Sequence, residues 1–322
     1  MIYRIACCLA LLLGIGVSAA HCQSWPTRTV RLIVPQSPGS NLDIVARAVA
    51  SQVQAQTGQP VIVVNRPGAG STLGPADVAR AEPDGYTLLA AAATLTIAPS
   101  TIAHLPFNVE KDLTPILPLT NTPLTLVVPH GAYKSVADLV AAAKAGNGAL
   151  NYASVGFGSA SHFMGERFGL AGDFHAVQVP FRGTNEALTQ MLAGRSIAFF
   201  FAPLTTTRAL IAAKKIDCLA VTSSARDPSL PDVPTMAEAG FPKASFDMWV
   251  GMFGPARLDA KTADDIYAQF SKAISDPSVK TKLSNLGSQL MPSMSQGKFR
   301  AVVDEEVARN SQIAKAAGIV AR

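Results

Sequence analysis

The sequence predicts an α/β fold in two domains, with parallel-rich sheets flanked by helices. Short β-branched runs alternate with Ala-rich helical stretches along the chain. These runs are apolar throughout rather than at every second residue, which is typical of strands buried on both faces of a parallel sheet. The chain has 322 residues, 48% of them hydrophobic. That length exceeds what one compact domain usually holds, so we expect two domains.

The N-terminal residues have the pattern of a secretory signal peptide. A positive charge at Arg4 precedes the apolar run Ile5–Val17, which a group of small residues follows. The run is too short to span a bilayer stably. We therefore expect residues 1–23 to be a signal peptide and the mature protein to be exported and soluble. Cleavage after Ala20 fits best, although a lipid anchor at Cys22 stays an alternative.

The remaining chain divides into strands and helices in alternation. The expected strands are TVRLIVP, PVIVVN, YTLLAAA, LTLVVP, LNYASV, AVQVPF, SIAFFF, CLAVTS and MWVGMFG. The expected helices are Leu42–Thr57, Gly74–Ala81, Val136–Ala145, Ser161–Leu170, Asn185–Leu192, Thr206–Ala213, Met236–Ala239, Ala263–Ser275 and Gln296–Ala317. Ser40 and Ser135 each precede an acidic residue by three positions, a capping pattern that marks two of the helix starts.

We expect the chain to cross between the domains twice. NTPLTLVVPHGAYKS has the character of a crossing into a second α/β unit, and FPKASFDMWVGMFGP that of the return. Domain 1 would then be discontinuous, with residues 24–124 plus 246–322, and domain 2 would span residues 125–245. Two crossings form a hinge, which favours closure of the domains around a ligand.

Charge and cysteine content exclude several classes of partner. Charged residues make up 15% of the chain with a net charge of +5, and the basic residues are scattered singly. Nucleic acid is therefore not an expected partner, and the excess charge indicates only weak steering of anions. Cys218 lies in the apolar stretch IDCLAVTSS, where we expect a buried, inert thiol. The five His are far apart, so neither a metal nor a cofactor is expected.

Four loops that follow strands have the form of anion-binding loops. They are VPQSPGSN, SVGFGSAS, VPFRGTN and FFFAPLTTT, each rich in Gly, Ser or Thr. Ligands of open α/β sheets bind beyond the carboxyl ends of the strands, where free N–H groups at helix starts favour a negative charge. The alternative is that these residues only cap helices, and it stays open.

Catalysis has little support in the sequence. PGAGSTLG has the wrong glycine spacing for a dinucleotide loop, and Arg66-Pro67-Gly68 fits a rigid turn better. Ser159 or Ser161 with His162 would be the best case for an exported α/β hydrolase, but no G-x-S-x-G elbow is present. We expect a protein that is not an enzyme, with the hydrolase as the alternative.

Eight motifs in order resemble one family of receptors. They are VRLIVPQSPGSNLDIVAR, QPVIVVNRPGAGSTLG, PDGYTLL, KSVADLVAAAK, LNYASVGFGSASH, VPFRGTNEALTQMLAG, LAVTSSARDPSLPDVPTMAEAGFP and WVGMFGPA. Together they look like the extracytoplasmic solute receptors of the tripartite tricarboxylate transporter family, the Bug proteins. The resemblance implies a two-lobed periplasmic binding protein fold of type II-like form, with the ligand cleft between the lobes. It also implies a periplasmic location, a small organic or aromatic acid as ligand, and a membrane permease as partner. A sensor kinase in place of the permease stays an alternative, and a monomer is expected.

The resemblance also carries site residues onto this chain. The ligand-binding candidates are Ser37, Pro38, Gly39, Ser40, Thr94, Thr96, Gly156, Phe157, Ser159, Ser161, His162, Arg182 and Ala202. In the family, backbone amides of the loop at Pro38-Gly39-Ser40 would hold one ligand carboxylate. Arg182 would pair a carboxylate or lie on the surface, and a structural role for His162 is equally open.

Two departures from the family pattern bear on the ligand. Ser40 stands where the family usually has a second glycine, which narrows the backbone freedom of the loop. Ala202-Pro203 replaces the Asp-Asn of many members, and Ala202 cannot pair the amino group of an amino acid. We therefore expect no amino acid ligand. Because strand neighbours alternate faces, only part of Phe199–Phe201 can border the pocket, which favours an aromatic or apolar-bodied acid.

Overall fold

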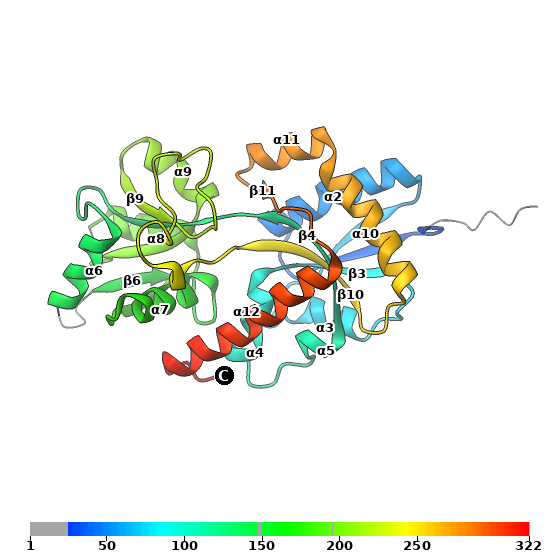
Figure 1. Cartoon of the computed structure of the whole chain (residues 1–322), viewed down its shortest axis with the longest axis horizontal. Coiled ribbons are helices and arrows are strands. Elements are labelled where there is room, and N and C mark those ends of the chain that lie inside the picture. The colour runs from blue at the N-terminus through cyan, green and yellow to red at the C-terminus, as the bar shows by residue number, and fades with distance from the viewer. Residues whose placement is uncertain (1–24, 147–149, 195, 322) are drawn as a thin grey trace, which may run out of the picture.

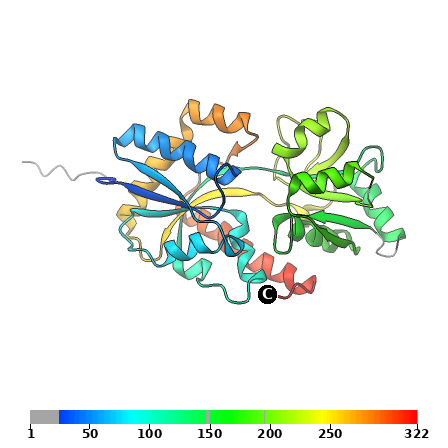
Figure 2. The same cartoon turned by 180° about the vertical axis from the view of Figure 1, so that it is seen from behind.

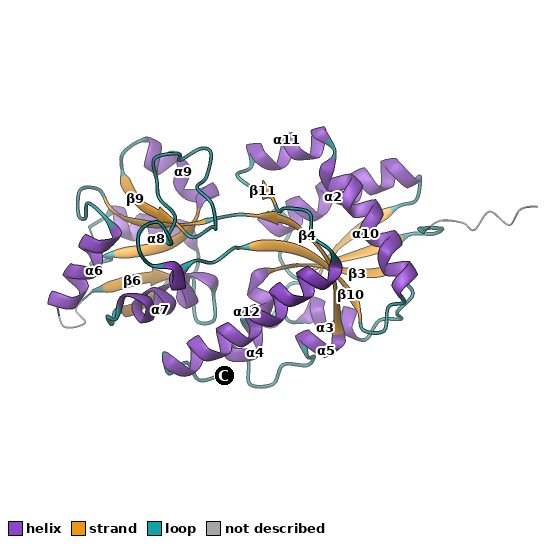
Figure 3. Cartoon of the chain, in the orientation of Figure 1, coloured by secondary structure: helices purple, strands orange, loops and turns teal. Residues whose placement is uncertain are grey.

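The chain folds into two α/β lobes that lie side by side, joined by extended segments (Figure 1). The structure is a computed structural model, and it describes residues 25–146, 150–194 and 196–321. Each lobe is built on one sheet, and helices flank both sheets (Figure 3). The α/β class expected from the sequence is therefore confirmed. The predicted signal peptide at residues 1–23 lies outside the described residues.

The first sheet has the strand order β11-β4-β10-β3-β1-β2, and the second has the order β7-β6-β8-β5-β9. The strands of the first sheet are β1 (Val30–Val34), β2 (Val61–Asn65), β3 (Thr87–Ala92), β4 (Leu113–Asn121), β10 (Trp249–Pro255) and β11 (Gln289–Leu290). Those of the second are β5 (Leu124–Pro129), β6 (Asn151–Ser154), β7 (Val177–Pro180), β8 (Phe199–Pro203) and β9 (Ile216–Val221).

Helices cover both faces of each sheet because neighbouring strand residues point to opposite sides. In the first lobe, α2 (Asn41–Thr57), α10 (Ala260–Ser275) and α11 (Pro277–Asn285) pack on one face, and α3 (Leu73–Ala79) and α12 (Gln296–Ala316) on the other. In the second lobe, α6 (Val136–Ala145) and α7 (Ala160–Gly172) cover one face, and α8 (Thr184–Leu192) and α9 (Leu204–Ala212) the other. The short elements are η1 (Ala69–Ser71), η2 (Ala93–Thr96), α4 (Ala98–Thr101), α5 (Val109–Asp112) and η3 (Pro242–Ala244).

Both sheets are mixed, so the expectation of parallel-rich sheets was too strong. β1 pairs in parallel with β2 and β3, and β6 with β7 and β8. In contrast, β10 runs antiparallel to β3 and β4, and β5 antiparallel to β8 and β9. The antiparallel pairs lie at and beside the crossings between the lobes: β4 continues into β5 after two residues, and β10 brings the chain back (Figure 2).

One expected helix is absent. Residues Met236–Ala239 form a turn, in which the Glu238 amide donates to Thr235 Oγ1 at 3.1 Å and Glu238 Oε2 accepts from the Thr235 amide at 2.8 Å. This reciprocal pair is a helix-start signal, which is why the sequence suggested a helix. However, the chain reaches Gly240, with a φ of 93°, before a second turn forms.

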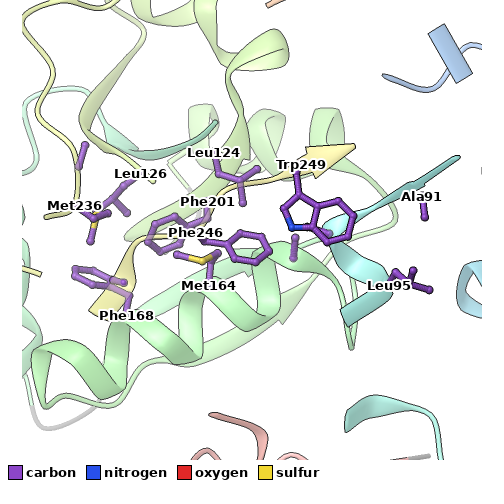
Figure 4. Close-up of a cluster of buried hydrophobic side chains, with 14 of the residues drawn as sticks. Ala91, Leu95, Leu124, Leu126, Met164, Phe168, Phe201, Met236, Phe246 and Trp249 are labelled. Atoms are coloured by element: carbon purple, nitrogen blue, oxygen red, sulfur yellow. The ribbon is translucent and has the colours of Figure 1, made fainter. Parts of the chain in front are cut away.

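The connection between the lobes is packed with apolar side chains. Leu124 and Phe201 meet Phe246 and Trp249, and this cluster continues to Met164 in the second lobe (Figure 4). Trp249 is completely buried. The segments that connect the lobes are residues 122–123, between β4 and β5, and residues 245–248, between η3 and β10. We propose 24–124 plus 246–322 and 125–245 as the limits of the lobes, within two residues of these segments.

Two further expectations concern membranes and thiols. None of the helices in the described part of the chain has the length and apolar character that crossing a bilayer requires. Cys218 is a free thiol, half-buried rather than fully buried. Burial raises its pKa to about 12, which keeps the thiol protonated and unreactive.

Candidate functional site

A cavity of about 400 Å³ lies between the lobes, where loops follow the carboxyl ends of β3, β6 and β8. From the first lobe and the crossings it is lined by Gln36, Gly70, Ser71, Thr94, Leu124 and Met248. From the second lobe it is lined by Val155, Phe157, Gly158, Ser159, Ala160, Ser161, Thr184, Phe200, Phe201 and Pro203. This is the position at which α/β sheets bind their ligands.

The first turn of α7 forms one wall of the cavity. Ser159 caps the helix, since its Oγ accepts from the His162 amide at 3.2 Å and donates to the Gly156 carbonyl at 2.7 Å. The amides of Ala160 and Ser161 follow Ser159 in the chain. Amides in the first turn of a helix have no helical carbonyl four residues earlier to which they can donate. An anion in the cavity would therefore meet N–H groups and the positive end of the helix dipole.

The start of α8 adds a second wall of the same kind. Gly183 is its N-cap in an extended conformation, and Thr184, the first residue of the helix, borders the cavity. Arg182 is exposed, and its amide donates to Glu186 Oε2 at 3.0 Å. The Arg182 side chain is not among the groups that line the cavity.

The Pro38-Gly39-Ser40 loop is organised around a buried carboxylate. Asp43 is 2% exposed; its Oδ2 accepts from the Gly39 amide and from Arg47 Nε, each at 2.9 Å, and its Oδ1 accepts from Asn65 at 2.8 Å. Burial opposes ionisation of this group, but the hydrogen bonds outweigh burial and hold the pKa of Asp43 below its ordinary value. The Asp43 carboxylate therefore holds the backbone of this loop in place.

The amides of this loop have acceptors within the protein. Gly39 donates to Asp43, and the Ser40 amide donates to the Ser37 carbonyl at 3.2 Å. Gln36, two residues before Pro38, borders the cavity, whereas Ser37 to Ser40 do not. A direct contact of this loop with a ligand carboxylate therefore stays a prediction.

Gly70 and Ser71 also border the cavity, although no site residue was predicted there from the sequence. The backbone takes positive φ angles in succession, 123° at Gly68, 46° at Ala69, 66° at Gly70 and 69° at Ser71. Such angles are unfavourable for residues with a side chain, so this loop is held in a strained form beside the cavity. The glycine spacing in PGAGSTLG was the available signal, but it was assigned to a rigid turn.

The remaining candidates from the sequence fall partly outside the cavity. Thr94 borders it, but Thr96 is buried, where its Oγ1 donates to the Ala93 carbonyl at 2.7 Å and accepts from Asn310 Nδ2 at 2.9 Å. Ala202 is buried in the core of the second lobe, while the next residue, Pro203, borders the cavity. Gly156 is not among the lining residues.

His162 is a buried support of the α7 loop. The ring is 4% exposed, and its Nδ1 accepts from the Gly158 amide at 3.1 Å. Burial lowers its pKa to about 4, so the imidazole is neutral at neutral pH. Ser159 and Ser161 place their hydroxyl oxygens 3.1 Å from each other, and the Ser161 Oγ also accepts from the Val155 amide at 3.0 Å. The arrangement lacks the serine-to-imidazole hydrogen bond that the hydrolase alternative requires.

The cavity combines neutral polar groups with apolar surface. No charged side chain lines it among the described residues. Its apolar lining residues are Leu124, Val155, Phe157, Ala160, Phe200, Phe201, Pro203 and Met248. Within residues 25–146, 150–194 and 196–321, no group of three or more His, Cys, Asp or Glu is arranged to hold a metal ion.

Comparison with known proteins gives the family. Residues 45–319 match the family model of the tripartite tricarboxylate transporter family receptor. The chain belongs to this family. It is also 33% identical over 250 residues to the protein BugT of Bordetella pertussis, covering 76% of each chain.

Two solved structures of similar proteins show bound acids. MatC from Rhodopseudomonas palustris, solved with malate, has a TM-score of 0.74 and 29% identity, and the match covers 90% of this chain and 100% of MatC. A second R. palustris protein, solved with adipate, has a TM-score of 0.76 and 28% identity, covering 92% and 100%. This tripartite tricarboxylate transporter receptor therefore has the two-lobed periplasmic binding protein fold that the resemblance implied.

Proposed function

We propose that this receptor captures a small carboxylate with an apolar body in the cavity between its lobes. The observation that carries the proposal is the lining: two helix starts and several hydroxyl groups border the cavity, and no charged side chain is among the described residues that line it. A carboxylate gains hydrogen bonds from the helix starts, and no acidic side chain is among the described residues that line the cavity. The acids bound to the two R. palustris proteins support the same class of ligand.

The apolar lining favours ligands of a particular shape. Phe157, which is 39% exposed, would pack against the body of the acid, while its carboxylate meets the starts of α7 and α8. A cationic amino group would find no carboxylate to pair with in this lining. We therefore propose a dicarboxylate or an aromatic acid rather than aspartate or glutamate.

Thermal unfolding of the mature protein with a panel of acids tests this function. The panel holds malate, adipate, citrate, benzoate, aspartate and glutamate. A ligand at about one hundred times its dissociation constant stabilises the native state by roughly 2.7 kcal/mol, which raises the unfolding midpoint. Aspartate or glutamate as the strongest stabiliser would contradict our account of Ala202, and the absence of a shift with every acid would contradict the carboxylate class.

A pair of threonine variants of α8 locates the ligand. Thr184→Val removes a hydroxyl at the cavity, whereas Thr189→Val removes one that donates to the Asn185 carbonyl on the exposed side of the same helix. Losing one hydrogen bond to a charged group should weaken carboxylate binding about tenfold in Thr184→Val. Thr189→Val should bind as the wild type does.

We also propose how the receptor reaches its place of action. Residues 1–23 would be removed on export, and the mature protein would work in the periplasm as a monomer that delivers its ligand to a membrane permease. Presentation of the closed form to a sensor kinase is the alternative. The intact mass of exported protein tests the cleavage site, and size-exclusion chromatography with light scattering tests the oligomeric state.

A further inference from the structure

A second cavity, of about 610 Å³, lies between α7, η3 and α12. It shares no lining residue with the cavity between the lobes. α12 belongs to the first lobe and extends toward the second, where it packs against α7 (Figure 1). We call this second cavity the α7–α12 groove.

Three cations line the α7–α12 groove. Arg167 comes from α7, Lys243 from η3 and Arg309 from α12. Within the described part of the chain, none of the three forms a salt bridge. Apolar groups of Leu170 and Ile313 complete the walls.

Arg167 is the central group of the α7–α12 groove. It is only 5% exposed, and its Nε donates to the Lys243 carbonyl at 2.6 Å. The guanidinium carbon lies 5.8 Å from the centre of the Phe246 ring. This hydrogen bond fixes the orientation of the side chain but uses only one of the five N–H donors of a guanidinium. Among the described residues no carboxylate lies within salt-bridge distance of this buried charge, and burying a charge without such a partner is costly, which makes the environment of Arg167 favourable for an anion.

The charges around Arg167 leave a positive excess. Burial, together with the positive charge of Arg309, lowers the pKa of Arg167 to about 10. Glu306 is the acid that acts on both arginines, but burial, with a smaller contribution from Asp247, raises its pKa to about 7 against their influence. Glu306 is therefore only partly ionised at neutral pH and does not balance the two guanidinium groups.

We propose that the α7–α12 groove binds a multivalent oxyanion between Arg167 and Arg309. Guanidinium groups bind such oxygens in a forked, bidentate manner, and two of them facing one cavity fit an ion with more than one negative charge. Lys243 adds a third charge. Because Arg167 belongs to the second lobe and Arg309 to the first, the bound ion ties the lobes together and stabilises their closed arrangement.

Calorimetric titration with inorganic phosphate at neutral pH and constant ionic strength tests the site, with sodium chloride as the control for general salt effects. Arg309→Gln should weaken phosphate binding about tenfold, because one charged hydrogen-bonding partner is lost. Lys315→Gln removes the same charge from an exposed position of the same helix and should leave phosphate binding unchanged. Arg167→Lys keeps the charge but removes the fork and should also weaken binding.

Three results would overturn the proposal. One is phosphate binding of equal strength in the wild type and Arg309→Gln. Another is phosphate binding that Thr184→Val abolishes, because the anion would then occupy the cavity between the lobes. The third is no binding beyond the chloride control in a wild type that still binds its carboxylate. Circular dichroism and an unchanged carboxylate response confirm that Arg309→Gln is folded.

Discussion

Acidification should weaken both the fold and the ligand cavity through His162. Its buried ring accepts a hydrogen bond at Nδ1 from the amide of Gly158, which borders the cavity. Nδ1 must therefore be unprotonated. Protonation would place an N–H at Nδ1 facing the N–H of Gly158, so the hydrogen bond would be lost. Burial lowers the pKa of His162 from 6.5 to about 4. Because the folded-state pKa is lower than that of the unfolded chain, this contribution to stability is complete above pH 6.5 and is lost as the pH falls toward 4.

The size of the effect follows from the two pKa values. One pKa unit corresponds to about 1.36 kcal/mol, so a fall from 6.5 to about 4 corresponds to roughly 3 kcal/mol of unfolding free energy. The ring is 4% exposed, so solvent screens this effect little. Carboxylate affinity should fall over the same pH range, since release of the Gly158 amide loosens the loop at the start of α7.

Urea unfolding at a series of pH values between about 4 and 6.5 measures this contribution. His162→Asn supplies an acceptor near the position of Nδ1 but does not titrate. The difference in unfolding free energy between wild type and His162→Asn should therefore shrink by roughly 3 kcal/mol across the range. His104→Asn, at an exposed position, should follow the wild type. A wild-type advantage over His162→Asn that is constant with pH would refute the reasoning.

Three other substitutions probe separate parts of the structure. Gly165→Ala places a Cβ about 2.2 Å from the buried ring of Tyr152, so urea unfolding should show a loss of about 3 kcal/mol, and an undiminished free energy would count against this packing. Glu306→Gln should gain stability relative to the wild type as the pH rises from 4.5 to about 7, because the raised pKa makes ionisation of the wild-type carboxyl unfavourable; parallel pH curves would exclude this account. Asp43→Asn should lose about 2 kcal/mol and bind the carboxylate more weakly, since the Gly39 loop loses its anchoring charge; retention of both properties in unfolding and titration would show that the loop does not depend on it.

Local sequence patterns predicted most strands but missed β4. This strand contains Pro115 and Pro118, and a proline in a central strand normally argues against one because it cannot donate to the ladder. The structure accommodates both beside irregularities in the pairing with β10: the register shifts between Val250 and Gly251, next to Pro118, and between Met252 and Phe253, next to Pro115. Such bulges depend on the partner strand, which lies far away in the sequence.

The candidate site likewise has a part that local sequence patterns predict and a part that depends on tertiary packing. The start of α7 was predictable, because Gly and Ser followed by a helix pattern after a strand is a local signal. The contribution of Ser71 was not, since its place at the cavity depends on how close the second lobe approaches. The loop that carries Thr96 was predicted correctly, but the direction of the Thr96 hydroxyl was not. The packing of α12 decides whether this hydroxyl faces the ligand or Asn310.

The two proposed sites are connected through the helices α7 and α12. α7 presents Ser161 to the cavity between the lobes, and Arg167 lies less than two helical turns further along at the α7–α12 groove. α12 carries Arg309 into the groove, and the hydrogen bond from Asn310 ties it to Thr96 in the loop that also carries Thr94. An oxyanion that draws α7 and α12 together therefore favours the arrangement in which the carboxylate is held from both lobes. Linkage then requires each ligand to raise the affinity of the other by the same factor, so phosphate should tighten carboxylate binding as much as carboxylate tightens phosphate binding, and Arg309→Gln should remove both effects together.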